Sequence, residues 1–144
     1  MQKNLSSPTL TARVIGYSGL IPFIGLSAIS VLWHDIHHSA VLFSLLAYGA
    51  TIVSFLGAIH WGLTMREERP DGFAIIWGVI PSLLAWISLI LDTRIGLVIQ
   101  LVTLCICLAV DLKRYPRLGV SGWLKLRLQL TFVAVICIAF PVLM

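Results

Sequence analysis

Apolar residues dominate five stretches of this chain, and short polar segments separate them. The stretches cover residues 14–33, 40–65, 73–91, 95–112 and 126–144. Each is about as long as the roughly 17 to 25 residues with which a helix crosses the ~30 Å hydrocarbon core of a bilayer. Backbone polar groups in lipid must be satisfied within the segment, and the two-residue alternation of a membrane barrel strand is absent. The pattern therefore predicts transmembrane helices.

Composition supports the membrane assignment. Hydrophobic residues make up 59% of the chain and charged residues 11%, with a mean hydropathy of +1.00. Soluble domains carry about 25% charged residues. Only the connection from Asp111 to Lys125 is long, and no Pro-rich or Ser-rich linker interrupts the chain. We predict an all-α fold, a polytopic membrane helix bundle in which residues 1–144 form one integral membrane domain with five transmembrane helices.

The basic residues predict the orientation of the helices. If the five helices alternate in direction, nine of the ten Lys and Arg residues lie on one side, and only Arg94 lies on the other. The nine are Lys3, Arg13, Arg66, Arg69, Lys113, Arg114, Arg117, Lys125 and Arg127. Because Lys and Arg near helix ends concentrate on the cytoplasmic side, we expect a cytoplasmic N-terminus and an external C-terminus.

The expected location is the bacterial inner (cytoplasmic) membrane. The first 34 residues lack acidic side chains and contain several Ser and Thr, so a mitochondrial inner membrane is the alternative. A cleavable signal peptide is a competing interpretation, with Lys3 and Arg13 as its basic region and residues 28–30 as the cleavage site. The apolar run, however, is longer than a usual signal core and contains Pro22.

Small residues recur at helical spacing in two of the stretches. In the second they are Ala50, Ser54, Ala58 and Gly62, and in the third Ala74, Gly78 and Ser82. Such stripes let helix backbones approach closely in a membrane, where van der Waals packing drives association. We expect the second and third helices to form a packed hairpin.

His60, followed by Trp61, is the titratable side chain well inside the second helix. An ionisable group in a membrane span suggests function because it is costly without a partner or water. Three interpretations remain open: packing and hydrogen bonding, with Trp61 as an interfacial anchor; proton or quinone chemistry; and metal or haem ligation. Asp111 and Gln129 flank the same end of the bundle, but no acid is expected deep enough to complete a proton relay with His60.

Three histidines follow the first helix, and they are His34, His37 and His38. Their spacing of three and four residues would place them on one face of a helical turn as candidate Zn or Cu ligands, although a solvated polar cap needs the same residues. From His38 to His60 a continuous helix rises about 33 Å. The two histidine sites therefore cannot share a small cofactor, and no cofactor is predicted.

Prolines and basic residues supply two further hypotheses. The pattern Gly-x-Ile-Pro ends at both Pro22 and Pro81, where kinked helices can mark a transport site. The connection before the fifth helix carries basic residues suited to anionic lipid at the cytoplasmic face, namely Lys113, Arg114, Arg117, Lys125 and Arg127. The positive-inside rule explains these charges, so no nucleic acid is expected to bind.

Several motifs together resemble the transmembrane protein 69-like family, also called domain of unknown function 3429. They are the runs over residues 16–23, 48–50, 54–62, 80–86 and 123–127, with His60-Trp61-Gly62 the most specific. The resemblance covers nearly the whole chain. It implies a small multi-helix membrane protein, bacterial or mitochondrial, and supplies no catalytic residue. His34, His37 and His38 lie outside the shared pattern.

Three classes of function follow from these features. The first is a non-enzymatic accessory or assembly component that docks on a membrane-protein partner, or on a second copy, through its small-residue faces. The alternative is a small carrier or channel that uses the kinked helices and His60. A quinone- or haem-associated redox subunit is a weaker alternative. The sequence offers no Ser/His/Asp set, paired buried carboxylates or phosphate loop, so we do not expect an enzyme.

The predicted orientation can be tested with a reporter fused after Met144. Five alternating helices and the distribution of basic residues predict reporter activity on the external side only. Activity on the cytoplasmic side would show that the number of spans or the orientation is wrong.

Overall fold

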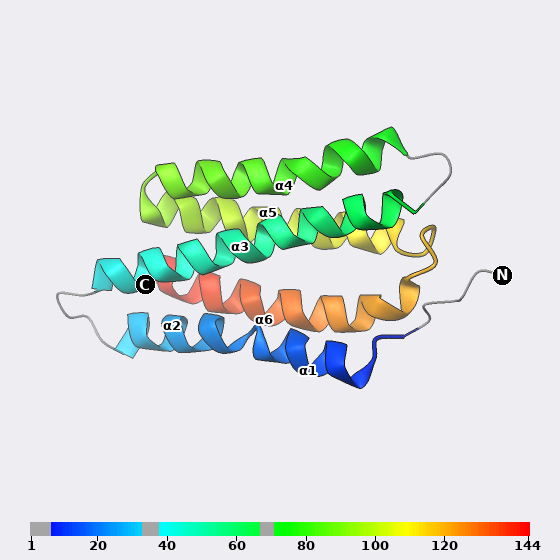
Figure 1. Cartoon of the computed structure of the whole chain (residues 1–144). Helices are drawn as coiled ribbons and strands as arrows, with labels where there is room; N and C mark the ends of the chain where they lie inside the picture. Colours follow the sequence, from blue (N-terminus) through cyan, green and yellow to red (C-terminus); the bar gives the residue numbers. More distant parts are fainter. Residues whose placement is uncertain (1–6, 33–37, 67–70) are drawn as a thin grey trace.

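The computed structural model describes residues 7–32, 38–66 and 71–144, and these residues are helical with no strand (Figure 1). The elements are α1 (Leu10–Ser18), α2 (Ile21–Leu32), α3 (His38–Thr64), α4 (Gly72–Ile90), α5 (Thr93–Arg114), the short 3₁₀ helix η1 (Ser121–Trp123) and α6 (Leu124–Leu143). With α1 and α2 taken as one segment, five segments of the described chain are long and apolar enough to span a membrane. The predicted all-α bundle of five spans is confirmed.

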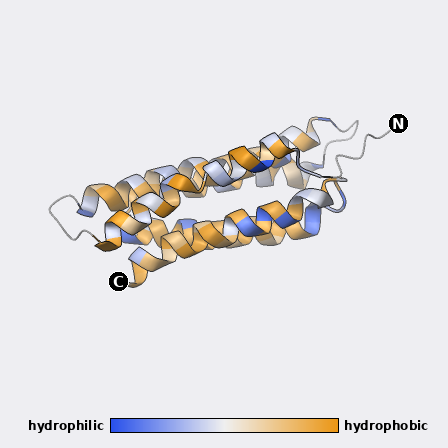
Figure 2. Cartoon of the chain, turned by 90° about the horizontal axis from the view of Figure 1, so that it is seen from below, coloured by the Kyte–Doolittle hydropathy of each residue, from blue (hydrophilic) through white to orange (hydrophobic). Residues whose placement is uncertain are grey.

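The five spans alternate in direction (Figure 1). We call the end at which α1, α4 and α6 begin the basic end. The basic residues that the structure describes there are Arg13, Arg66, Lys113, Arg114, Arg117, Lys125 and Arg127. Apolar residues cover most of the helix surfaces, and strongly hydrophilic residues gather mostly toward this end (Figure 2). Which side of the membrane the basic end faces stays a prediction.

Aspartates define where two of the helices begin. The carboxylate of Asp71 accepts a hydrogen bond from the backbone N–H of Phe73, and Asp92 does the same for Arg94 and Ile95. A side-chain oxygen at the N-cap satisfies backbone donors that have no partner inside the helix. The acidic residues of these turns therefore fix the starts of α4 and α5.

The first span differs from the prediction of one helix over residues 14–33, because a break at Gly19 and Leu20 divides it into α1 and α2. Pro22 lies in the first turn of α2, where its missing N–H removes no helical hydrogen bond. The phenol of Tyr48 donates to the carbonyl oxygen of Gly19 at 2.7 Å. This bond satisfies a carbonyl at the break and ties it to α3.

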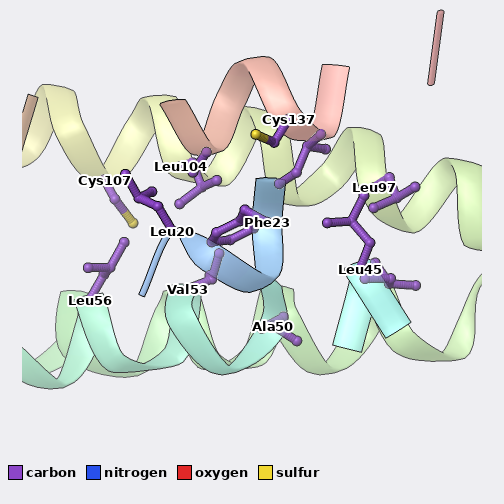
Figure 3. Packing of buried hydrophobic residues seen from close by; sticks show 14 of the residues in the cluster. Leu20, Phe23, Leu45, Ala50, Val53, Leu56, Leu97, Leu104, Cys107 and Cys137 are labelled. Atoms are coloured by element: carbon purple, nitrogen blue, oxygen red, sulfur yellow. The ribbon is translucent and has the colours of Figure 1, made fainter. Parts of the chain in front are cut away.

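The core lies around α3, which packs against α2, α4 and α5. Phe23 of α2 reaches the centre of the bundle, with Val53 of α3 and Leu104 of α5 close by (Figure 3). Leu45, Leu97 and Ile138 are also fully buried. The position of Phe23 depends on the helix break, because α2 rather than α1 packs on α3.

Glycines set the closest approach between α3 and α4. A Cβ atom added to Gly57 would lie 2.6 Å from the carbonyl oxygen of Gly78, and one added to Gly78 would lie 2.3 Å from the ring of Trp61. Trp61 also donates its indole N–H to the carbonyl of Ile75 at 2.6 Å. The predicted hairpin is present. Trp61 contributes to the packing of this hairpin, and its side chain is also partly exposed.

The small-residue stripe of α3 is only partly used in this hairpin. Ala74 and Gly78 of α4 are buried as expected, and so is Ala50. Ser54 and Ser82 are half-buried, whereas Ala58 and Gly62 are exposed. No described atom beyond its own helix and neighbours lies within 4 Å of a Cβ added to Gly62. The close contact with α4 is made by Gly57 on another face of α3, and Ala58 and Gly62 point away from this hairpin.

Matched glycine substitutions test this interface. We expect Gly57→Ala to lower the free energy of unfolding in detergent by about 1–3 kcal/mol, because the added methyl meets a backbone carbonyl. Gly62→Ala should be neutral or stabilising by up to about 1 kcal/mol, since alanine favours the helix and the space is open. Equal stability of the two variants would contradict the proposed contact.

Candidate functional site

A buried cluster of three charged or titratable side chains joins three helices near the basic end. Nε2 of His60 in α3 lies 2.8 Å from Oδ1 of Asp111 in α5. Nε of Arg127 in α6 donates to Oδ2 of the same carboxylate at 2.7 Å. His60 and Asp111 are only 1% and 2% exposed. We call these residues the His60–Asp111–Arg127 cluster.

Asp111 lies in the last part of α5 and faces α3. The helix continues to Arg114, two residues beyond the predicted end at residue 112. The expectation that no acid is deep enough to partner His60 is therefore wrong. Gln129, the other polar residue expected near His60, instead accepts a hydrogen bond from the phenol of Tyr17.

The electrostatics of the cluster favour a bonded and nearly neutral group. An isolated buried carboxylate is very costly, and the guanidinium of Arg127 balances the charge of Asp111. With Asp111 as the acceptor, His60 donates from Nε2. The arrangement holds α3, α5 and α6 together.

Some polar atoms of this region have no hydrogen-bond partner in the described part of the chain. They are Nδ1 of His60, the hydroxyl of Thr64 and Nη2 of Arg127. Nη1 of Arg127 makes only a long contact of 3.5 Å to the hydroxyl of Thr131. Both carboxylate oxygens of Asp111 are therefore hydrogen-bonded. His60 and Arg127 each keep one nitrogen that has no hydrogen-bond partner in the described part of the chain.

Tyr115 covers the cluster from the end of α5. Its ring centroid lies 6.0 Å from that of His60. Burial, reinforced by the negative charge of Asp111 and opposed by Arg127, raises the pKa of Tyr115 to about 12. Its phenol therefore remains a neutral hydrogen-bonding group at physiological pH.

A cavity of about 470 Å³ opens beside the cluster, and Tyr115 and Arg127 form part of its wall. The other lining residues come from α1, α3, α6 and the η1 region and are nearly all apolar; they include Ile15, Leu56, Ile59, Trp123, Leu126 and Leu130. The size falls within the range of about 300–1,000 Å³ found for ligand pockets. Sequence reasoning missed this cavity because its walls come from four separate parts of the chain.

A second buried polar layer surrounds Gln100 of α5. Its amide nitrogen donates to the carbonyl of Leu46 at 2.8 Å and to the hydroxyl of Ser88 at 3.0 Å. Gly49 makes room for this side chain, since a Cβ added there would lie 2.1 Å from Oε1 of Gln100. The layer joins α3, α4 and α5 and was not predicted, although a lone Gln in an apolar helix is a signal for such a contact.

The basic residues expected at the lipid surface divide into two groups. Lys113, Arg117 and Lys125 are exposed. Arg114 pairs with Asp71 and lies over the ring of Phe73 at 4.3 Å. Arg127 was predicted as a lipid-facing charge, but its side chain is only 11% exposed and binds Asp111. The positive charge of Arg127 is therefore paired with Asp111 inside the bundle.

The predicted histidine metal site lies largely outside the described residues. His34 and His37 fall in the segment 33–37, which the structure does not describe, and His38 is half-buried at the start of α3. Within residues 7–32, 38–66 and 71–144, no three His, Cys, Asp or Glu side chains are grouped to hold a metal ion.

Fold and site together define a small multi-pass helical membrane protein with a buried charge cluster near one end. The chain belongs to the family described as "Protein of unknown function (DUF3429)", whose sequence pattern matches residues 8–143. This confirms the resemblance that the motifs indicated.

Two curated relatives extend the comparison. Transmembrane protein 69 of Xenopus tropicalis is 34% identical over 139 residues, covering 92% of this chain and 54% of the relative. Transmembrane protein 69 of Mus musculus is 32% identical, with 92% and 55% covered. The chain thus spans about half the length of these relatives. No solved structure matches the chain.

The importance of the cluster can be measured with two arginine variants. We expect Arg127→Gln to lower the free energy of unfolding by about 3–5 kcal/mol, because it leaves the Asp111 charge poorly compensated in a buried site. Arg114→Gln breaks the more exposed pair with Asp71 and should cost about 0–1 kcal/mol. Denaturant titration in detergent would measure both values.

A double-mutant cycle provides the control. If the two charges depend on each other, Arg127→Gln combined with Asp111→Asn should be less destabilising than the sum of the single changes. Additive losses would show that the two side chains do not interact energetically.

Proposed function

We propose that this protein is a non-enzymatic accessory or assembly component that docks on a helix of another membrane protein. The observation that carries the proposal is the outward face of α3, which we call the docking face. Its exposed small residues are Ala40, Ser44, Thr51, Ala58 and Gly62. Their spacings of four and seven residues place them along one side of the helix.

The docking face differs from the other exposed helix faces. Many exposed positions on the other helices carry large apolar side chains, as with Leu83 and Trp86 of α4 and Phe132 and Phe140 of α6. Lipid chains pack well on such residues, whereas small residues in membrane helices favour close approach of another helix. Phe55 stands beside the small residues and offers one bulky contact.

The polar atoms of the docking face favour a helix as its occupant. The hydroxyl of Ser44 donates to the carbonyl of Ala40, and that of Thr51 donates to the carbonyl of Tyr48. These hydroxyls are thus satisfied within α3, and an apolar partner helix can cover them without leaving a donor unpaired. At Gly62 the open space extends to the backbone, so a partner could approach there most closely.

The packing of the titratable and kinked positions supports docking over the carrier or channel alternative. His60 is bound within the His60–Asp111–Arg127 cluster, and Pro81 is buried against Gly57. Pro22 occupies the start of α2 rather than a hinge inside a helix. His60 and Pro81 thus contribute to contacts between helices, as expected of a fixed scaffold.

The proposed setting is an inner membrane, bacterial or mitochondrial, with the basic end toward the cytoplasm or matrix. The exposed side chains of Lys113, Arg117 and Lys125 at this end would meet anionic headgroups. Positive charge on that side follows the usual rule for membrane insertion.

Bulky substitutions on the docking face test the proposal. A photo-crosslinking residue at position 58 should capture a discrete membrane protein, and the same residue at the exposed position 102 of α5 should not. Thr51→Leu should reduce the crosslink from position 58 by at least about tenfold, because extra volume blocks close helix approach. Mass spectrometry of the crosslinked product would identify its partner.

The matched control for packing is Val102→Leu, which adds similar bulk to an exposed position on α5. Val102→Leu should leave the crosslink unchanged. A product of twice the chain mass would identify the partner as a second copy bound through the same face. Equal crosslinking from positions 58 and 102, with a colourless monomer in mild detergent, would contradict the docking proposal.

A further inference from the structure

The first helix, α1, is held less firmly than the rest of the bundle. It buries none of its residues, whereas each of the other α-helices buries at least three. Among the described residues, a single side-chain hydrogen bond joins α1 to another helix, and it runs from the phenol of Tyr17 to Oε1 of Gln129 at 2.7 Å on an exposed surface. Segments with few buried contacts open more readily than a core.

The break between α1 and α2 has the chemistry of a hinge. Pro22 has no N–H, so the carbonyl of Ser18, four residues earlier, lacks the hydrogen bond that would continue the helix through the break. Gly19 has no side chain to restrict backbone rotation there. Beyond the break, the ring of Tyr48, whose phenol binds the carbonyl of Gly19, packs edge-on against Phe23 at 5.0 Å. The start of α2 is thus fixed on α3, and α1 can turn about the break.

α1 can turn as one piece, and the space it needs lies on its α3 side. The hydroxyl of Thr9 caps the helix by accepting a hydrogen bond from the N–H of Ala12, so α1 has a defined start of its own. The cavity has Ala12 and Ile15 of α1 in one wall and Ile59 and Leu63 of α3 in another. Contact between these apolar side chains would leave no polar group unpaired.

We propose that α1 is a hinged half-span that swings about this break between an open and a closed position. The structure shows the open position, in which Tyr17 binds Gln129 and the cavity is present. In the closed position this hydrogen bond is broken, and the apolar side of α1 lies against α3. The two positions are close in free energy, because closing exchanges one exposed hydrogen bond for apolar packing between helices. The movement does not depend on the docking face, whose five small residues do not line the cavity.

Distances between two spin labels test the hinge on the full chain in lipid nanodiscs. One label would replace Thr11 of α1 and the other Met65 at the end of α3, and both positions are exposed. Labels carried by an unnatural ketone amino acid leave the native cysteines unchanged. We expect two distances, the shorter one from the closed position, whereas labels at Ile24 of α2 and Phe43 of α3 should give a single distance.

Two variants should shift the balance in opposite directions. Tyr17→Phe removes the bond to Gln129, so the ratio of the shorter to the longer distance should rise about two- to tenfold, the effect of losing one net hydrogen bond. Ile59→Trp fills the cavity from the α3 side and should lower the ratio by at least about fivefold. The control Ser44→Ala removes an exposed hydroxyl that bonds within α3, and it should leave the ratio unchanged.

A single distance between positions 11 and 65 in the unmodified chain and in all variants would overturn the proposal, because α1 would then be fixed. An unchanged ratio in Tyr17→Phe would overturn it as well, since the hydrogen bond would not hold the open position. If Tyr17→Phe does not fold, as judged by circular dichroism and gel filtration, Gln129→Leu removes the same bond and decides. An equal spread of distances for both label pairs would assign the movement to the whole bundle rather than to α1, which also contradicts the hinge.

Discussion

The burial of one carboxylate is the constraint on which the basic end of this bundle depends. Asp111 is only 2% exposed, and the core of the bundle is otherwise largely aliphatic. Such a charge is tolerable only with a nearby cation and donors for both oxygens, and Arg127 and His60 supply these from two other helices. The three helices α3, α5 and α6 must therefore keep their relative rotation and depth at this level.

Close backbone contacts impose a similar constraint along the rest of α3. Hydrophobic burial gives little drive for association between helices in lipid, so contacts depend on fit and on hydrogen bonds. Gly57 lets the carbonyl of Gly78 approach, and Gly49 leaves space for Gln100. Gly57 thus allows α3 to pack closely on α4, and Gly49 allows it to pack on α5. The hydrogen bond from Gln100 to α3 completes the second contact.

These packed faces explain why the remaining surfaces differ from one another. The cluster and the two glycine contacts use inward faces of α3, which leaves a small-residue face outward and an apolar cavity on the α1 side. The outward face supports binding of a helix. The proposed docking is therefore a consequence of how α3 is rotated within the bundle.

The sequence by itself determined the elements and their alternation. The five apolar stretches and the pattern of basic residues depend on local chemistry and on length, which can be read without knowing any contact. The helix ends found in the structure mostly differ from the predicted ones by only a few residues. The family motif around His60-Trp61-Gly62 was equally visible, because it is a run of neighbouring residues.

Only the tertiary structure decided which faces meet. Periodicity identifies a stripe of small residues but does not say whether it points inward, so Ala58 and Gly62 were assigned to packing while Gly57 makes the contact. The pairing of His60 with Asp111 and Arg127 joins residues far apart in sequence, and it depends on helix rotation. The rotation of each helix depends on many contacts among side chains, and these contacts form only when all five spans are packed together.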